Sequence, residues 1–159
     1  MVKNKTNKPE FVVILPYVKN KILMQLRDEK ENINFPGQWG FFGGTIDIGE
    51  TPEVAAKREL LEEIGYKPKN IHKFFMDKIP EHSDCIAHAY CCPLTVNAEN
   101  IKLKEGTDFG LFSVEEIRTG YLYSTRMKKS FSTIRIPHLM GTINAFLEYL
   151  KNIENVKNL

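Results

Sequence analysis

Residues 44–66 read GTIDIGETPEVAAKRELLEEIGY, and no other part of the chain has so many local structural signals. Thr51 is a favourable helix N-cap, and Pro52 suits the first helical position, where its missing N–H is not needed. Gly65 suits the residue just past a helix end, where the backbone often turns left-handed. These signals predict a helix that begins at Pro52 and ends before Gly65.

The predicted helix is strongly acidic. Between Asp47 and Glu63 there are six acids against two bases, in a chain whose total charge is +2. Glu59, Glu62 and Glu63 are spaced i, i+3 and i+4, so they project from one helix face. Each repelling pair on that face costs about 2–3 kcal/mol at an effective dielectric constant near 20. Structural needs alone do not select such a face.

Two features set this acidic face apart from an ordinary solvated helix surface. Glu62 and Glu63 stand near the predicted C-terminus of the helix, where the macrodipole disfavours anions. Gly43 and Gly44 precede the helix and permit close approach of the backbone to a ligand. Mg²⁺ binds oxygen ligands, often carboxylates together with substrate phosphates. The residues therefore indicate either a solvated acidic helix or a metal-assisted site for a phosphorylated small molecule.

The same stretch resembles the Nudix box, whose pattern is G-x5-E-x7-R-E-U-x-E-E-x-G-U, with U a bulky aliphatic residue. All the fixed letters are matched, and Tyr66 at the last aliphatic position is the one departure. The resemblance extends upstream to Pro36–Gly44, where Phe42 replaces the usual proline, and downstream to Lys104–Gly106 and Phe109–Ile117.

This resemblance implies an α/β fold of the Nudix type, an α/β/α sandwich around a mixed β-sheet. We expect one domain over residues 1–159, with residues 1–9 as a loose N-terminal lead-in. Hydrophobic periodicity and turn signals predict strands at Phe11–Val18, Ile22–Arg27, Trp39–Ile46, Ile71–Ile79, Cys85–Val96 and Phe109–Phe112, and helices at Ser113–Ile117 and Pro137–Ile153. The third strand is expected to break at Gly43-Gly44. The last helix is expected to pack on the sheet, with a dimer contact as the alternative.

The resemblance also implies roles for the acidic residues. Glu59, Glu62 and Glu63 would ligate Mg²⁺ or Mn²⁺, with the Gly43 carbonyl as a further ligand. Bound metal would polarise the pyrophosphate, activate water and stabilise the developing charge.

The family places its general base either in the box or on a later loop. Glu105 matches the later position and is the first candidate, and Glu62 is the second. Glu105 has a simpler alternative as a solvated loop acid. Arg58 is expected to pair with Glu50 and hold the shape of the loop and helix.

Four residues are candidate substrate contacts: Arg27, Trp39, Arg126 and Lys128. Arg27 ends a predicted strand and could contact a phosphate. Trp39 could flank a base, although core packing is the favoured role. Between Arg118 and Arg135 lie five basic residues, interleaved aromatics and no acid. That segment indicates either a loop that grips phosphates and stacks a base, or a solvated connection.

Composition limits the class of partner. The 159 residues include 22 Lys+Arg and 20 Asp+Glu, and so small a surplus argues against a nucleic-acid coat protein. No apolar stretch approaches the length that spans a bilayer, so we expect no membrane partner. Three cysteines without a C-x-x-C pair favour reduced thiols and a cytoplasmic location.

We therefore expect a Nudix hydrolase, monomeric or homodimeric, that acts with Mg²⁺ on a small-molecule nucleotide. It would cleave a phosphoanhydride bond in a nucleoside diphosphate linked to another moiety, such as a nucleoside triphosphate or nucleotide sugar. The alternatives are an ADP-ribose-type pyrophosphatase and a catalytically idle module that only binds a nucleotide. The complete glutamate set favours an enzyme, since idle relatives usually lose one or more of these residues.

Overall fold

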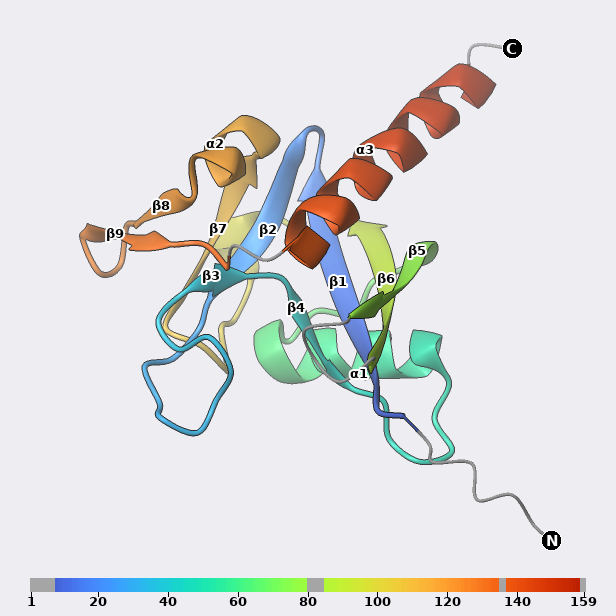
Figure 1. The fold of residues 1–159 in the computed structure, drawn as a ribbon. Coiled ribbons are helices and arrows are strands. Elements are labelled where there is room, and N and C mark those ends of the chain that lie inside the picture. The colour runs from blue at the N-terminus through green and yellow to red at the C-terminus, as the bar shows by residue number, and fades with distance from the viewer. Residues whose placement is uncertain (1–7, 80–84, 135–136, 158–159) are drawn as a thin grey trace, which may run out of the picture.

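The computed structural model describes residues 8–79, 85–134 and 137–157. Within these ranges, seven strands form one sheet: β1 (Glu10–Val18), β2 (Lys21–Leu26), β3 (Trp39–Gly40), β4 (Phe42–Thr45), β5 (His72–Ile79), β6 (Cys85–Pro93) and β7 (Asp108–Ser113) (Figure 1). The main strand order is β3-β2-β1-β6-β5, with β4 paired to β1 and β7 paired to β2. β1 and β6 run parallel, and the other pairs of this sheet are antiparallel. The sheet is therefore mixed, as predicted.

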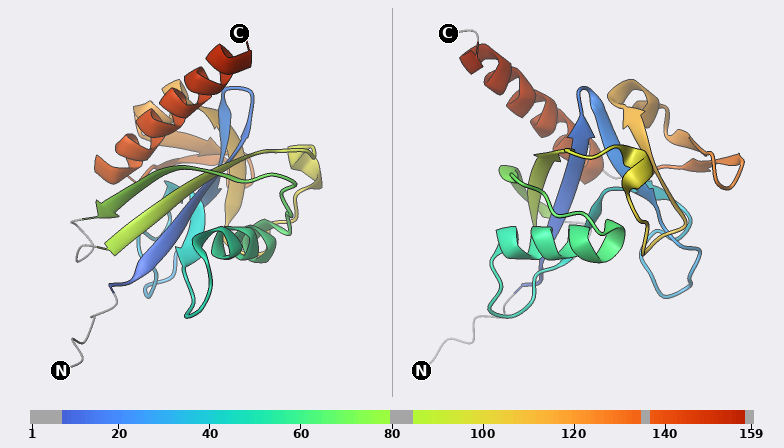
Figure 2. Two further views of the ribbon diagram at one scale, coloured as in Figure 1. Left: turned by 90° about the vertical axis from the view of Figure 1, so that its right-hand side faces the viewer. Right: turned by 180° about the vertical axis from the view of Figure 1, so that it is seen from behind.

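Helices cover both faces of this sheet (Figure 2). α1 (Pro52–Ile64) packs on one face, while α2 (Val114–Thr119) and α3 (Pro137–Lys157) pack on the other. The neighbouring side chains of Cys91 and Cys92 enter the two opposite hydrophobic clusters, as the strand alternation requires. All three cysteines are buried free thiols. The predicted α/β/α sandwich is confirmed.

The ends of α1 are those that its sequence predicts. The Thr51 hydroxyl accepts a hydrogen bond from the Val54 N–H at 3.3 Å, and Gly65 adopts the left-handed conformation with φ of +64°. Tyr66, the departure from the Nudix pattern, is 6% exposed, and its hydroxyl donates to the Pro93 carbonyl at 3.2 Å. The aromatic ring therefore fills a core position, and its polar end reaches the last residue of β6.

The two glycines before α1 do not interrupt a strand. Gly43 and Gly44, which lie in β4, pair with Val13 and Val12 of β1, and the break falls two residues before Gly43, at Phe41 between β3 and β4. Because both glycines take part in the β1–β4 pairing, the backbone at these positions is held beside β1 and beneath α1 and does not form a flexible joint.

α3 packs on the sheet, as predicted, and continues to Lys157. The Phe146 ring is buried against Tyr17 and Phe74, with ring centroids 5.2 Å and 5.7 Å apart. The C-terminal part of the helix extends past the sheet (Figure 1). Val156, near the end of the helix, is 71% exposed. In the part of the chain that the structure describes, no helix is long and apolar enough to cross a membrane.

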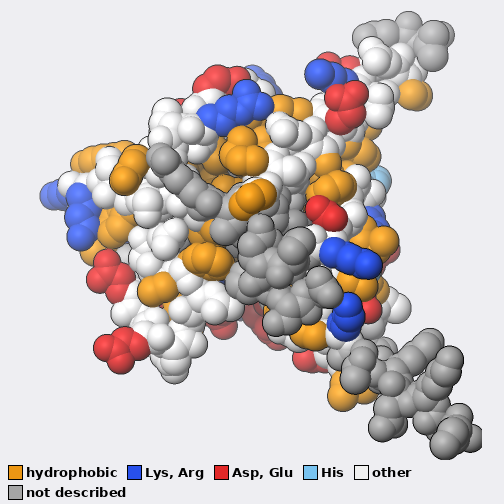
Figure 3. All heavy atoms as spheres, in the orientation of Figure 1, with side chains coloured by type: hydrophobic (Ala, Val, Ile, Leu, Met, Phe, Trp, Pro, Cys, Tyr) orange, Lys and Arg blue, Asp and Glu red, His pale blue; other side chains and the backbone are white. Residues whose placement is uncertain are grey.

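The basic segment after α2 is not a simple loop. β8 (Tyr121–Ser124) and β9 (Lys129–Ser132) form an antiparallel hairpin, and Figure 3 shows Lys and Arg side chains gathered at its free end. Arg135 and most of the predicted lead-in, residues 1–7, lie outside the described residues.

Candidate active site

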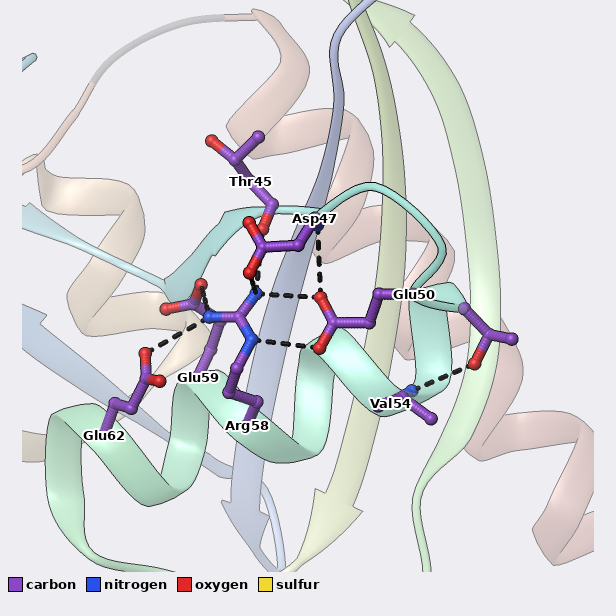
Figure 4. A network of polar contacts seen from close by, with 8 residues as sticks. Thr45, Asp47, Glu50, Val54, Arg58, Glu59 and Glu62 are labelled. Carbon is purple, nitrogen blue, oxygen red and sulfur yellow. Dashed lines mark hydrogen bonds and ion pairs between the residues drawn. The ribbon is translucent and has the colours of Figure 1, made fainter.

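Arg58 is the centre of a polar network on α1 (Figure 4). Its Nε and Nη2 donate to the two carboxylate oxygens of Glu50 at 2.9 Å and 3.0 Å, so this pair is bidentate. The guanidinium also donates to Glu59 at 2.7 Å, to Glu62 at 3.2 Å and to the Thr45 carbonyl at 3.0 Å. The hydrogen bonds from Arg58 lower the pKa of Glu50. The predicted Glu50–Arg58 pair is confirmed, and it ties the preceding loop to the helix.

Glu63 lies on the buried side of α1 and is only 5% exposed. Its carboxylate accepts a hydrogen bond from the Gly43 N–H at 3.1 Å. Burial, with smaller contributions from the nearby carboxylates of Glu59 and Glu105, raises the pKa of Glu63 to about 8, although the hydrogen bond from the Gly43 N–H opposes the shift. Burial also raises the pKa of Glu59. Both acids therefore lose their protons less readily than a free glutamate, Glu59 even though the Arg58 guanidinium donates to it, and a divalent cation bound near them would favour their charged forms.

The backbone opposite these glutamates needs its two glycines for different reasons. Gly43 has φ of +147°, and a Cβ there would lie 2.0 Å from the Val12 carbonyl oxygen. A Cβ at Gly44 would lie 2.3 Å from Glu59 Oε1. The first glycine therefore permits the backbone path, while the second leaves room for the Glu59 carboxylate.

A cavity of about 380 Å³ opens beside the carboxylates. Its walls are formed by Gln25, Arg27, Asp28, Lys30, Ile33, Gly43, Glu59, Glu63, Lys104, Glu105 and Gly106. α1 and β4 supply one wall, and the segments after β2 and before β7 supply the others. The cavity therefore joins carboxylates that suit a cation to basic side chains that suit phosphates.

Glu105 is fixed relative to α1 by its backbone. The N–H groups of Lys104 and Glu105 both donate to the Glu63 carbonyl, at 2.8 Å and 3.2 Å. On the other side, the Gln25 side-chain amide donates to the Glu105 carbonyl at 3.0 Å. The loop that bears this predicted general base is thus anchored directly to the helix that bears the predicted metal ligands.

Glu62, the second candidate base, has a different environment. Its side chain is 51% exposed and its carboxylate bonds the Arg58 guanidinium at 3.2 Å. It does not line the cavity that the described residues form. The structure therefore brings Glu105, and not Glu62, next to Glu63 in the cavity.

The predicted substrate contacts fall in different places. Arg27 lines the cavity, and its Nε donates to the Asn34 carbonyl at 2.7 Å. Trp39 is 0% exposed, its Nε1 donates to the Leu122 carbonyl at 3.1 Å, and its ring packs edge-on against Phe112. A completely buried ring cannot flank a nucleotide base, so the substrate-contact prediction for Trp39 is corrected to a core role.

Arg126 and Lys128 lie in the turn of the β8–β9 hairpin. Arg126 Nη1 donates to the Thr107 carbonyl at 3.2 Å, next to the cavity residue Gly106. Lys128 is exposed and has φ of +56°. Neither side chain lines the cavity among the described residues, so any role in substrate binding lies at its edge.

Sequence reasoning missed several cavity residues. Asp28 and Lys30 form an ion pair of 2.9 Å, and Lys104 Nζ donates to the Leu61 carbonyl at 3.2 Å, near the C-terminal end of α1. In the sequence, the signal was a cluster of charges directly after β2 and before β7. That signal indicates polar loops, but it does not show that both loops face one cavity.

The carboxylates fit a hard divalent cation by their chemistry. Glu63 and Glu59 are buried acids with raised pKa values, and such groups gain most from a nearby positive charge. Within the described residues, no group of three or more His, Cys, Asp and Glu side chains is already gathered at metal-binding spacing. Here Arg58 holds oxygens of Glu59 and Glu62 instead.

Several nucleoside triphosphate hydrolases are similar to this chain over short segments. An oxidized purine nucleoside triphosphate hydrolase from Danio rerio is 54% identical over 37 residues, which is 23% of this chain and 24% of that protein. A nucleoside triphosphatase NudI from Escherichia coli O139:H28 is 36% identical over 56 residues, or 33% and 38% of the two chains. The matches therefore span less than half the length of these relatives.

Solved structures and a family model match far more of the chain. The NUDIX domain of Shewanella oneidensis NrtR, complexed with ADP ribose, has a TM-score of 0.66 at 18% identity and covers 94% of this chain and 93% of that one. A NUDIX hydrolase from Nitrosomonas europaea has a TM-score of 0.58 at 22% identity, with coverage of 70% and 60%. At these identities the similarity shows the fold. The family model described as NUDIX domain matches residues 6–131, and the chain therefore belongs to the Nudix family.

Proposed function

We propose that this protein is a Mg²⁺-dependent pyrophosphohydrolase of small-molecule nucleotides, with Mn²⁺ as a possible substitute. Its reaction would cleave a phosphoanhydride bond in a nucleoside diphosphate linked to another moiety, such as a nucleoside triphosphate or nucleotide sugar. The observation that supports this proposal is the cavity in which Glu59, Glu63 and Glu105 face basic side chains. A cytoplasmic location is part of the same proposal.

Glu59, Glu62, Glu63 and the Gly43 carbonyl are the proposed metal ligands. When bound, the cation would polarise the phosphoanhydride and lower the pKa of an attacking water. The role of the chain is to keep these oxygen donors on one rigid surface, which the Gly43–Glu63 hydrogen bond and the helix spacing support. Arg58 holds Glu59 and Glu62 through its guanidinium, and its bond to Glu50 fixes that guanidinium in turn.

Glu105 is the proposed general base, and Glu62 is the second choice. Glu105 lines the cavity and is held by the Gln25 amide and the Glu63 carbonyl, so its position relative to α1 is fixed. It would take the proton from the water that attacks phosphorus. Arg27 is proposed to contact a substrate phosphate from the neighbouring wall.

An ADP-ribose-type activity, or nucleotide binding without turnover, is the second candidate. The similarity over 94% of the chain to a NUDIX domain complexed with ADP ribose favours testing it. The full set of Glu59, Glu62 and Glu63 favours an enzyme over a binding module.

The test is release of phosphate and pyrophosphate with Mg²⁺ from nucleoside triphosphates, nucleotide sugars, ADP-ribose and dinucleoside polyphosphates. We expect one preferred class, and a loss of kcat of about 10²–10⁴-fold in Glu63→Gln and in Glu105→Gln. The control is Glu53→Gln, because Glu53 lies on the same helix but is exposed and pairs with Lys57 at 2.6 Å. Unchanged kcat in both test variants would contradict the assignment. ADP-ribose binding by calorimetry without turnover would favour the binding module.

A further inference from the structure

Asp108 is a buried carboxylate outside the predicted metal site. It begins β7, two residues after the cavity residue Gly106, and is 5% exposed. Its Oδ2 accepts a hydrogen bond from the Ser124 hydroxyl at 2.5 Å and one from the Arg126 N–H at 3.4 Å. Its Oδ1 accepts from the Phe109 N–H at 2.9 Å. Asp108 thus binds the tip of the β8–β9 hairpin to the end of the Glu105 loop.

The groups around this carboxylate are all hydrogen-bond donors. Ser124 is 0% exposed and links Asp108 to the hairpin turn, because its Oγ also accepts a hydrogen bond from the Met127 N–H at 3.0 Å. An asparagine at position 108 would place an amide N–H₂ against at least one of these donors. The arrangement therefore requires acceptor oxygens on both sides, which a carboxylate supplies and an amide does not.

Further hydrogen bonds fix Thr107, the residue whose backbone carbonyl Arg126 contacts. The Thr107 N–H donates to the Leu26 carbonyl at 2.8 Å, and the Thr107 hydroxyl donates to Asp28 at 3.2 Å. Arg126 Nη1 donates to the Thr107 carbonyl at 3.2 Å, and its Nε lies 4.0 Å from Asp108. The guanidinium is therefore held against a rigid segment that continues directly into Gly106 and Glu105.

Arg126 still has donors for a ligand. A guanidinium has five N–H donors, and the Thr107 carbonyl takes one of them. The side chain is 56% exposed. Between Tyr121 and Ser132 the hairpin contains three basic residues and no acid, so its tip is electropositive, and it lies next to the Glu105–Gly106 wall of the cavity.

We propose that Arg126 selects substrates by binding a phosphate that lies beyond the two phosphates joined by the cleaved anhydride bond. Asp108 is the positioning residue that holds Arg126 in place for this contact. The substrate class this favours is a nucleoside triphosphate over a nucleotide with a neutral distal group. The inference rests on the proposed nucleotide site, and it adds a specificity determinant to it. Asp108 acts through the hairpin and does not itself touch substrate.

The test measures binding without requiring turnover. Calorimetry with Mg²⁺ compares the α,β-imido analogues of ATP and GTP with AMP and GMP, for the wild type and for Arg126→Gln and Asp108→Asn. We expect each variant to bind the triphosphate analogues about 5- to 20-fold more weakly and the monophosphates within about twofold of wild type. The matched control is Lys129→Gln, which removes the same charge from the same hairpin but from a side chain stacked on Phe131 at 4.7 Å.

A double variant separates positioning from independent binding. If Asp108 acts through Arg126, then Asp108→Asn combined with Arg126→Gln binds the analogues no more weakly than Arg126→Gln alone. Additive losses would contradict the positioning role. Should Asp108→Asn fail to fold, Ser124→Ala loosens the same connection more gently and is expected to weaken analogue binding in the same direction.

The outcomes also separate this inference from the proposed function. A wild type that binds the triphosphate analogues but hydrolyses no nucleotide contradicts the hydrolase proposal. In that case the analogue affinity of Arg126→Gln relative to the wild type still decides the role of Arg126. Wild-type hydrolysis with unchanged analogue binding in Arg126→Gln overturns the Arg126 role alone. Absence of analogue binding to the wild type overturns this inference as well.

Discussion

The environment of Glu63 explains why one acid of the α1 face differs from the others. Its side chain is buried while that of Glu62 is half exposed, although the two are neighbours in the sequence. Burial raises the pKa of Glu63 to about 8, so the folded, metal-free protein binds a proton there that the unfolded chain releases near pH 4.5. Stability from this group is therefore present below about pH 4.5 and is lost as pH rises through about 8.

We expect Glu63→Gln to remove this pH dependence. In the presence of a chelator, the wild type should lose about 1–3 kcal/mol of unfolding free energy between pH 5 and pH 8 through this group, and the variant should lose less. The amide oxygen can still accept the bond from the Gly43 N–H. Urea unfolding at the two pH values measures the difference, with Glu53→Gln as the exposed control. Equal pH dependence in the variant and the wild type would contradict the buried-acid account.

The two glycines opposite α1 make a second prediction at this scale. Gly43→Ala should destabilise the fold strongly, by about 2–4 kcal/mol, because its Cβ would meet rigid backbone of β1 in a conformation that L residues rarely adopt. Gly44→Ala should cost less stability, because its Cβ meets the movable carboxylate of Glu59. Its expected effect is on metal affinity, measured by Mn²⁺ titration. A Gly43→Ala protein as stable as the wild type would contradict the close approach of Gly43 to the Val12 carbonyl.

At the scale of elements, the best-predicted parts are those whose signals are local. The cap at Thr51 and the turn at Gly65 lie within the sequence they delimit, so the bounds of α1 could be predicted correctly. The β8–β9 hairpin could not. Its strands have four residues each, its turn lacks the Asn-Gly or Asp-Gly signal, and its tip depends on Asp108. The hydrogen bond between Ser124 and Asp108 joins residues 16 positions apart on different elements, so it produces no periodic pattern in the sequence from which it could be predicted.

The same reasoning applies to the site. The spacing of Glu59, Glu62 and Glu63 predicts a shared helix face, but it does not show which of them is buried. For Trp39 the sequence favours a core role but leaves a ligand contact open, since the partner that fixes the side chain, the Leu122 carbonyl, is 83 positions away. The cavity itself depends on the meeting of four segments that are separate in the sequence, which only the fold determines.

The N-cap of α1 provides a prediction at the element scale. Thr51→Ala removes the acceptor for the Val54 N–H and should lower the unfolding free energy by about 0.5–2 kcal/mol. Thr51→Ser keeps the hydroxyl oxygen and should stay within a few tenths of a kcal/mol of wild type. Chemical denaturation measures both. Equal losses in the two variants would mean that the methyl group, and not the cap, carries the effect.

At the scale of the whole molecule, the sheet separates two hydrophobic clusters that serve different purposes. The cluster under α1 supports the carboxylates, whereas the cluster under α2 and α3 contains Trp39, Phe146 and residues next to the hairpin. The strands β1 and β6 contribute to both, so the two sides share one sheet and cannot separate without exposing it. A core substitution far from the cavity should therefore lower the free energy of unfolding while leaving metal and nucleotide binding nearly unchanged.

Phe146→Ala tests this coupling. The ring is 1% exposed and packs against Tyr17 and Phe74, so its loss should cost about 3–5 kcal/mol of unfolding free energy. Because the change lies on the face opposite α1, the protein that remains folded should retain its metal affinity and the KM for its preferred nucleotide within about twofold, while its Tm falls. Val156→Ala is the control on the same helix, since that side chain is 71% exposed and should be nearly neutral. Thermal unfolding and Mn²⁺ titration of the three proteins decide the matter. A large change in metal affinity with little loss of Tm would mean that α3 shapes the cavity directly, in conflict with the separation of the two clusters by the sheet.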